Sequence, residues 1–385
     1  MGRNLFIAAG IFHPESGGPA TYLYEILPEL QRRGWDVRAI TYGAGDTAAY
    51  PYALTRIPRR ALPLRLAHYG AAAFPLLRWA DVVYVHTLDL PLIGGRAPRI
   101  VKIVGDQAWE RAIRKGWIPP TEDIDAFQTR PANGVVAAQQ AARSRQVRAM
   151  QGVVVPSAYL KRMVVGWGVP EERVQVIYNA LPPEPSGAAT ETPLLALSQA
   201  EARARLNLPD VPTVVTAARL TPWKGVDHLI AALRQVPDAH LLVAGEGETH
   251  PDLERQVAQA GLTGRVRFLG RIDRARLALY FRAADYLALY SGYEGLSHTL
   301  LEALQVGTPV IASDKGGNPE VVQHGVNGLL VAYVNVEALA DALTEAFKPG
   351  MRAHLASNHA IGMERFSFGG MVEATDALLR MYAGG

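Results

Sequence analysis

The 385-residue sequence contains no cysteine, little lysine and no long apolar run. Without cysteine the chain cannot form a disulfide, a thiolate metal site or a catalytic thiol. No segment reaches the roughly 20 apolar residues that a membrane-spanning helix needs. The N-terminus lacks the layout of a signal peptide, so we interpret it as a first buried strand. These absences lead us to expect a cytoplasmic protein.

Charge is unevenly distributed along the chain, although the net charge is only +3. Residues 1–180 carry 22 Lys and Arg against 14 Asp and Glu, or +8, and the remainder carries 17 against 22, or −5. A basic first half indicates an acidic partner or an anionic membrane surface. A general preference for arginine, with 33 Arg against 6 Lys, explains the same excess without any partner. Because the excess is diffuse and lacks interleaved aromatic residues, we do not expect nucleic-acid binding.

Apolar runs that alternate with helical segments occur in two series, and the length of the chain favours two domains. The first series predicts strands at Leu5–Ala9, Val37–Tyr42, Val82–Val85, Ile100–Val104, Val153–Val155 and Val174–Ile177. The second predicts strands at Thr213–Ala217, His240–Gly245, Val266–Leu269, Tyr286–Leu289 and Pro309–Ala312. Continuous Val and Ile runs are typical of parallel strands that are covered on both faces. The predicted fold class is therefore α/β, with two Rossmann-like domains and a cleft between them.

The proline-rich segment Leu181–Gly187 can be neither a helix nor a central strand, so we interpret it as a linker. This places an N-terminal domain at 1–180 and a C-terminal domain at 181–365. The tail, 366–385, is expected to be helical and to pack back on the first domain. Ligands of such sheets bind at the carboxyl ends of the strands, so the loops there should carry the function.

Two cations, Arg219 and Lys224, follow the predicted strand Thr213–Ala217. Lys224 stands directly before a predicted helix, whose free backbone N–H groups favour an anion. A fixed arginine and lysine at this position would suit a diphosphate. The alternative is an ordinary solvated pair on the surface.

Two carboxylates, Glu294 and Glu302, follow the predicted strand Tyr286–Leu289. Gly295 permits a tight turn, and Ser297 is a candidate N-cap for the helix that carries Glu302. Carboxylates accept hydrogen bonds from vicinal hydroxyl groups, which is how proteins hold a ribose or a hexose. The glycine pairs Gly17-Gly18 and Gly316-Gly317 also lie at carboxyl ends of strands, where the backbone can approach a phosphate.

These motifs, together with Gly245-Glu246-Gly247 and Phe268-Leu269-Gly270, resemble the retaining GT-B glycosyltransferases of family four (glycosyltransferase group 1). The resemblance covers nearly the whole chain and is strongest over residues 213–331. It implies a metal-independent enzyme without a cofactor, whose donor substrate is a nucleotide-diphosphate sugar and whose acceptor is a hydroxyl group. It also implies that the N-terminal domain faces the acceptor and that the C-terminal domain binds the nucleotide sugar.

The resemblance assigns roles to individual residues. Arg219 and Lys224 would hold the diphosphate, Glu302 the ribose and Glu294 the transferred sugar. Gly17 and Gly18 would close over the phosphate. The remaining donor contacts would come from Gly270, Ile272, Gly295, Leu296, Ser297 and His298.

The chain departs from the family on the acceptor side. The family commonly has a histidine after the strand that corresponds to Ile100–Val104, and this chain has Gly105-Asp106 instead. Asp106 is either an acceptor-side base or hydroxyl anchor, or a helix cap without a chemical role. His86, which follows Val82–Val85, is the other candidate base, although a lone histidine is more often structural.

The segment Arg56–Leu66 mixes cations with apolar residues in the basic domain. One interpretation is a peripheral contact with the inner face of a membrane, which would suit a lipid-linked acceptor. The other is an ordinary loop and helix start, because Pro58, Pro63 and Pro75 argue against a long amphipathic helix. The rival functions are a nucleotide-sugar epimerase or hydrolase of the same architecture, and a non-catalytic sugar-nucleotide-binding protein.

Overall fold

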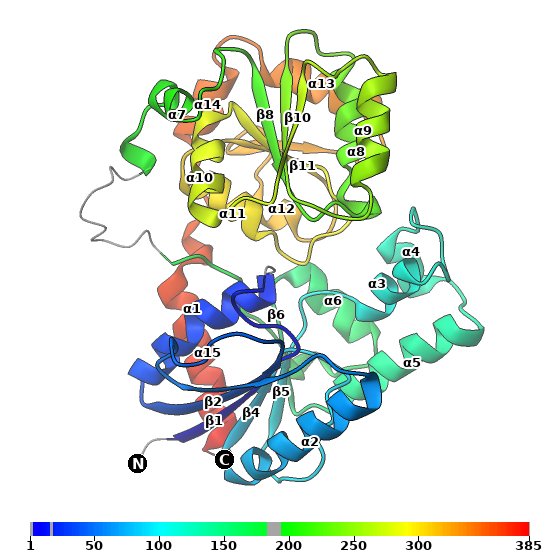
Figure 1. Cartoon of the computed structure of the whole chain (residues 1–385), viewed down its shortest axis with the longest axis vertical. Helices are drawn as coiled ribbons and strands as arrows, with labels where there is room; N and C mark the ends of the chain where they lie inside the picture. The colour runs from blue at the N-terminus through cyan, green and yellow to red at the C-terminus, as the bar shows by residue number, and fades with distance from the viewer. Residues whose placement is uncertain (1–2, 16–17, 183–193, 385) are drawn as a thin grey trace. The chain divides into compact units, whose positions relative to one another are not determined.

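The computed structural model describes residues 3–15, 18–182 and 194–384. In this part the chain forms two compact units, each built around one parallel sheet (Figure 1). One unit comprises Met1–Trp117, Gln128–Asn179 and Phe368–Gly385, and the other comprises Ile118–Phe127 and Ala180–Ser367. The predicted α/β class with two Rossmann-like domains is confirmed.

The first unit contains a seven-stranded sheet in the order β3-β2-β1-β4-β5-β6-β7. Its strands are β1 (Arg3–Ala8), β2 (Trp35–Tyr42), β3 (Ala53–Ile57), β4 (Val82–Val85), β5 (Arg99–Lys102), β6 (Gly152–Val155) and β7 (Val174–Val176). Every neighbouring pair is parallel. All residues of β4 and β6 are buried, as expected for Val-rich strands that are covered on both faces. The sequence did not predict β3.

Helices cover this sheet. They are α1 (Gly18–Arg32), α2 (Leu62–Trp79), α3 (Gln107–Arg114), α5 (Gly134–Arg148), α6 (Ala158–Gly166) and the C-terminal α15 (Phe368–Ala383), while α4 (Ile124–Thr129) begins in the segment that groups with the second unit. Arg56–Leu66 contains the end of β3, a loop and the start of α2, in agreement with an ordinary loop and helix start. The prolines do not shorten the helix, however, because α2 spans 18 residues. Pro63 lies in its first turn, where a missing N–H costs nothing, and the helix accommodates Pro75 inside it.

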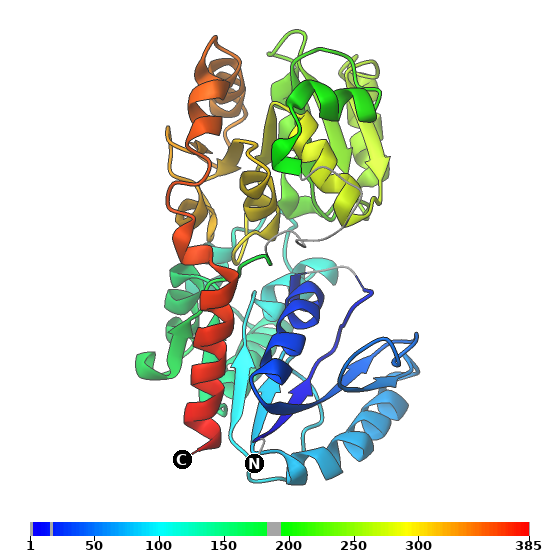
Figure 2. The same cartoon turned by 90° about the vertical axis from the view of Figure 1, so that its left-hand side faces the viewer.

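The C-terminal helix α15 belongs to the first unit and lies beside α1 and β4 (Figure 2). Asp376 accepts hydrogen bonds from Trp35 Nε1 at 2.7 Å and from Arg380 Nε at 2.9 Å. Near the end of the helix, the Tyr382 hydroxyl donates to the Gln151 carbonyl at 3.0 Å. These contacts join the last residues of the chain to a sheet that begins with its first residues.

The second unit contains a six-stranded parallel sheet in the order β10-β9-β8-β11-β12-β13. Its strands are β8 (Thr213–Ala217), β9 (His240–Ala244), β10 (Val266–Gly270), β11 (Tyr286–Leu289), β12 (Val310–Ser313) and β13 (Gly328–Val331). Its helices are α7 (Gln199–Arg205), α8 (Val226–Leu233), α9 (His250–Gln259), α10 (Arg274–Ala283), α11 (His298–Gln305), α12 (Asn318–Val321), α13 (Val336–Ala346) and α14 (Met351–Ser357). A core of buried Val, Leu and Ile side chains joins β8, β9 and β11 to α8 and α13.

Residues 118–127 group with the second unit, whereas the sequence placed them in the first domain. Within the second unit Lys315 Nζ lies 3.0 Å from Asp123 Oδ2. Ile118, Ile124 and Phe127 are buried. Apolar burial and the ion pair of Lys315 with Asp123 therefore help to hold this segment in the second unit, and no change in composition marks the segment in the sequence.

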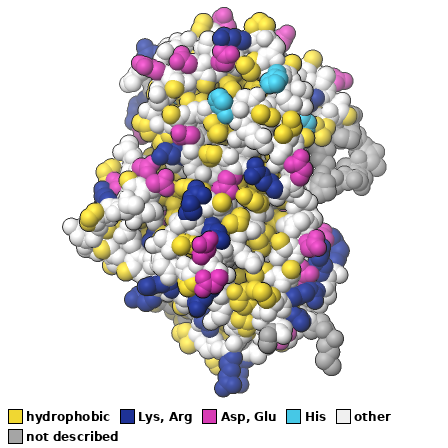
Figure 3. All heavy atoms as spheres, turned by 180° about the vertical axis from the view of Figure 1, so that it is seen from behind, with side chains coloured by type: hydrophobic (Ala, Val, Ile, Leu, Met, Phe, Trp, Pro, Cys, Tyr) yellow, Lys and Arg dark blue, Asp and Glu magenta, His cyan; other side chains and the backbone are white. Residues whose placement is uncertain are grey.

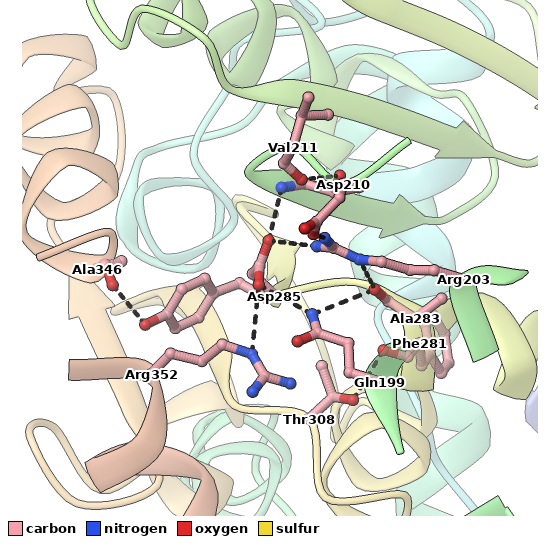
Figure 4. A network of polar contacts seen from close by, with 12 residues as sticks. Gln199, Arg203, Asp210, Val211, Phe281, Ala283, Asp285, Thr308, Ala346 and Arg352 are labelled. Atoms are coloured by element: carbon pink, nitrogen blue, oxygen red, sulfur yellow. Dashed lines mark hydrogen bonds and ion pairs between the residues drawn. The ribbon is translucent and has the colours of Figure 1, made fainter. Parts of the chain in front are cut away.

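A partly buried carboxylate, Asp285, anchors α7 to the start of β11 (Figure 4). It accepts hydrogen bonds from Arg203 Nη2 at 2.8 Å, from Gln199 Nε2 at 2.9 Å and from the Thr213 backbone N–H at 2.7 Å. Arg352 Nε lies 3.4 Å from the Oδ1 atom of Asp285. The carboxylate thus neutralises two arginines that would otherwise be poorly solvated.

We expect Asp285→Ala to lower the free energy of unfolding by about 3–5 kcal/mol, because the buried Arg203 would lose its enclosed carboxylate partner and keep only the exposed Asp210. Chemical denaturation measures the change. Asp210→Asn is the matched control, since Asp210 also pairs with Arg203 but is fully exposed. Equal losses in the two variants would contradict the anchoring role of Asp285.

Candidate active site

The predicted donor residues gather where the order of the second sheet reverses. The strands β8 and β11 are neighbours in this sheet, although they are not consecutive in the chain. Arg219 and Lys224 follow β8, and Glu294 follows β11. The carboxyl ends of two such strands form the crevice in which open parallel sheets bind ligands.

Lys224 and Glu294 contact each other directly. Lys224 Nζ lies 2.6 Å from Glu294 Oε1, and the two side chains are 18% and 14% exposed. This charge-assisted hydrogen bond brings together the cation predicted to bind phosphate and the carboxylate predicted to bind sugar. The sequence predicted that both lie at the site, but it did not predict their pairing.

Backbone contacts fix the two loops against one another. The Gly292 N–H donates to the Trp223 carbonyl at 2.8 Å. Gly225 has a φ of +63°, and a Cβ atom there would lie 1.9 Å from the Tyr290 carbonyl oxygen. Only glycine fits this approach, which holds Lys224 beside the end of β11. The Gly317 N–H donates to the Glu294 carbonyl at 2.8 Å, so the loop after β12 packs on the same turn.

Arg219 is exposed on the loop after β8. In the part of the chain that the structure describes, its side chain has no hydrogen-bond or ion-pair partner. Its guanidinium is therefore available to an anion at the mouth of this site.

Glu302 lies on α11, whose N-cap is Ser297: the Leu300 N–H donates to the Ser297 hydroxyl at 3.3 Å. Arg274 Nε donates to Glu302 Oε1 at 3.0 Å. Burial raises the pKa of Glu302, and the charge and hydrogen bond of Arg274 oppose that rise. Sequence reasoning missed Arg274, because only the fold brings the start of α10 to the second turn of α11.

The other predicted donor residues surround these loops. Gly295, Leu296 and Ser297 are buried in the turn before α11, and His298 is the first residue of the helix. Gly270 ends β10 with a φ of +64°, and Ile272 follows it. These residues lie at or just beyond the carboxyl ends of β10 and β11, as predicted.

The glycine pair after β1 is only partly described. Gly17 lies outside the described residues. Gly18 is the exposed first residue of α1, and a Cβ atom there would meet no described atom within 4 Å.

The structure favours the cap interpretation of Asp106. Its side chain is fully buried and accepts from the N–H groups of Ala108 at 2.9 Å and Trp109 at 3.4 Å, at the start of α3. It also accepts from Gln128 Nε2 at 2.9 Å and pairs with Arg143. A carboxylate with these partners holds the helix and the arginine, and it is poorly placed to take a proton from an acceptor.

His86 follows β4 and is buried, with 9% of its surface exposed. Burial lowers the pKa of its ring well below the ordinary value, and the charge of Lys102 lowers it further. Lys102, the last residue of β5, is 3% exposed, and burial lowers its pKa to about 7. Sequence reasoning missed Lys102, although a lysine inside an apolar strand is unusual and marks a candidate functional residue.

Family models match both halves of the chain. Residues 16–184 match the model described as Glycosyltransferase Family 4, and residues 198–360 match the one described as Glycosyl transferases group 1. With the two parallel-sheet units, these matches define a glycosyltransferase of GT-B architecture. The chain belongs to glycosyltransferase family four, as its motifs predicted.

Individual relatives agree with this assignment. The chain is 29% identical to the D-inositol 3-phosphate glycosyltransferase of Xylanimonas cellulosilytica, over 96% of this chain and 92% of that enzyme. It is 37% identical to the GDP-mannose-dependent alpha-(1-6)-phosphatidylinositol monomannoside mannosyltransferase of Mycobacterium tuberculosis, over 38% of this chain and 41% of that enzyme.

Solved structures share the fold. Sucrose-phosphate synthase from Thermosynechococcus elongatus has a TM-score of 0.77 at 22% identity, over 100% of both chains. HepE from Anabaena in complex with UDP-glucose has a TM-score of 0.75 at 22% identity, over 98% of this chain and 99% of that chain. In the part of this chain that the structure describes, no helix is long and apolar enough to span a membrane.

We expect Lys102→Met to stabilise the protein in a pH-dependent way. The unfolded chain holds the lysine proton up to about pH 10.5, whereas the folded state releases it near pH 7. The cost of the buried charge is therefore complete below pH 7 and disappears as the pH rises towards 10.5. The gain should be roughly 3 kcal/mol at pH 6, because the Tyr22 ring, 3.9 Å from Lys102 Nζ, offsets part of the desolvation.

Chemical denaturation of Lys102→Met and wild type between pH 6 and 10 would measure this difference. Lys161→Met is the control, because Lys161 is partly exposed and pairs with Glu171. A difference between Lys102→Met and wild type that stays constant with pH would contradict the buried, uncompensated charge.

Proposed function

We propose that this glycosyltransferase moves a hexose from a nucleotide-diphosphate sugar to a hydroxyl acceptor with retention at the anomeric carbon and without a metal ion or other cofactor. The observation that carries the proposal is the contact of Lys224 with Glu294 at the point where the sheet order reverses. A cation and a carboxylate 2.6 Å apart support this proposal, because one ligand that carries phosphate and hydroxyl groups could contact both.

Each donor group has a place on the second unit. Arg219 and Lys224 bind the diphosphate, and Glu294 accepts from hydroxyl groups of the transferred sugar. Glu302, which pairs with Arg274, accepts from the ribose. The backbone around Gly270 and Ile272 contacts the base. Relatives support this donor class: one is named as GDP-mannose-dependent, and one solved neighbour is in complex with UDP-glucose.

The chemical step depends on charge that develops on the leaving diphosphate. Arg219, Lys224 and the backbone N–H groups at the start of α8 stabilise that charge where it forms. The acceptor hydroxyl attacks the anomeric carbon on the face that the diphosphate leaves, and its proton passes to the departing phosphate oxygen. This route needs no protein base, in keeping with the occupied carboxylate of Asp106.

Lys224→Ala should reduce transfer by about 100-fold or more, because it removes a cation from the developing charge. A thermal-shift panel of nucleotide sugars identifies the donor, and product analysis with that donor then measures transfer. Lys348→Ala is the control, since Lys348 is exposed in the same unit and pairs with Glu345. Near-wild-type turnover of a folded Lys224→Ala variant would refute the assignment.

We further propose a cytoplasmic enzyme that touches the inner face of a membrane through α2, which suits a lipid-linked acceptor. Leu62, Leu64 and Phe74 are exposed on this helix, and Arg59 and Arg60 precede it. Apolar side chains beside cations are typical of helices that lie in an anionic interface. Nucleic-acid-binding proteins usually present a continuous basic surface. On the face shown in Figure 3, cationic and acidic side chains are interspersed instead.

Flotation with vesicles that contain anionic lipids tests the membrane contact. The double variant Leu62→Ser and Leu64→Ser should lose most of its vesicle binding, because the apolar anchor is removed while the arginines remain. Ile361→Ser, which removes an exposed apolar side chain from the second unit, should bind as wild type does. Absence of wild-type binding at low salt would rule out the contact.

A further inference from the structure

His86 lies where the order of the first sheet reverses, between β1 and β4. Its backbone N–H donates to the Ala8 carbonyl at 2.8 Å. The Gly10 N–H donates to the Thr87 hydroxyl at 2.9 Å, and a Cβ atom on Gly10 would lie 2.8 Å from that side chain. These contacts hold the ends of β1 and β4 together, at the position where open parallel sheets bind ligands.

Two basic side chains at this position are buried without partners. His86 and Lys102 are both more than nine-tenths buried, with 9% and 3% of their surfaces exposed. Among the described residues, neither His86 Nε2 nor Lys102 Nζ has a hydrogen-bond partner. Buried polar groups in native proteins are nearly always satisfied, so two unpartnered basic nitrogens at one site are suited to an anionic ligand.

The groups that face these nitrogens are all neutral. The Tyr22 ring of α1 lies 3.9 Å from Lys102 Nζ, and the Tyr84 ring of β4 lies 4.3 Å from the His86 ring. The Tyr22 hydroxyl bonds to those of Tyr84 at 3.1 Å and of Thr375 on α15 at 3.4 Å. No described Asp or Glu pairs with His86 or Lys102, so the site lacks a negative charge.

We propose that His86 and Lys102 form a subsite for an anionic group, a phosphate or a carboxylate, on the acceptor. His86 is the more exposed of the two and contacts the anion, while Lys102 supplies a second positive charge behind it. Only the assignment of the anion to the acceptor rests on the proposed glycosyl transfer. Binding of the anion is a property of the first unit by itself.

Anion binding at this subsite takes up protons from solvent. Burial lowers the pKa of both bases, so around neutral pH His86 is neutral and Lys102 is only partly charged. An anion stabilises the protonated forms and raises both pKa values. Affinity is therefore highest at acidic pH, and above about pH 7 it falls by roughly tenfold per pH unit for each proton taken up.

Titration calorimetry of the full-length protein with sulfate, without donor or acceptor, tests the subsite. Sulfate keeps a constant charge between pH 6 and 9, so any change in affinity reports the protein. Lys102→Met and His86→Gln should each weaken sulfate binding at pH 6.5 by at least tenfold and reduce the proton uptake, which two buffers of different ionisation enthalpy reveal. Lys161→Met should bind sulfate as wild type does.

Acetate, titrated in parallel, separates the two chemistries: tighter sulfate binding assigns the subsite to a phosphate, and tighter acetate binding assigns it to a carboxylate. Absence of sulfate and acetate binding to wild type would overturn the proposal. Unchanged affinity in folded His86→Gln would also overturn it, whatever the fate of Lys102→Met. Because no donor is present, neither result depends on whether the enzyme transfers sugar.

Discussion

The close approach of the β8 and β11 loops is the constraint on which the donor site depends. Gly225 meets the Tyr290 carbonyl with no room for a side chain, and the Gly292 N–H bonds to the backbone of the β8 loop. Since parallel neighbours end at the same edge of a sheet, these two contacts suffice to bring Lys224 to Glu294. Electrostatics then adds a short ion pair, but backbone packing sets its geometry.

Sequence reasoning predicted those features that follow from apolar runs and from the order of the strands. The Val-rich runs predicted most of the strands, because strands covered on both faces must be apolar throughout. Placing Arg219, Lys224 and Glu294 after such strands located them at one edge of one sheet. The ion pairs of Lys224 with Glu294 and of Arg274 with Glu302 could not be predicted, because each depends on side-chain directions that only the packed loops determine.

The elements of the first unit were harder to predict from the sequence. Its strand β3, with exposed Ala53 and Thr55, lies at the edge of the sheet and lacks a continuous apolar run. The helix α2 tolerates two prolines that a pattern argument counts as breaks. Asp106 shows a more general limit: the same residue type, after the same strand, serves as a base when it is open and as a cap when it is enclosed. The burial of the side chain decides between the role of base and the role of helix cap, and the sequence alone does not show which side chains are buried.

The return of α15 to the first unit bears on how the chain folds as it is made. All strands of that unit have been synthesised once β7 is made. Trp35 and Tyr22, however, form hydrogen bonds with Asp376 and Thr375 of α15, which begins at residue 368. The second unit carries all its strands between residues 213 and 331 and can form its sheet before α15 is synthesised. On the ribosome, the domain that starts first therefore makes its contacts with α15 only after every strand of the second unit has been synthesised.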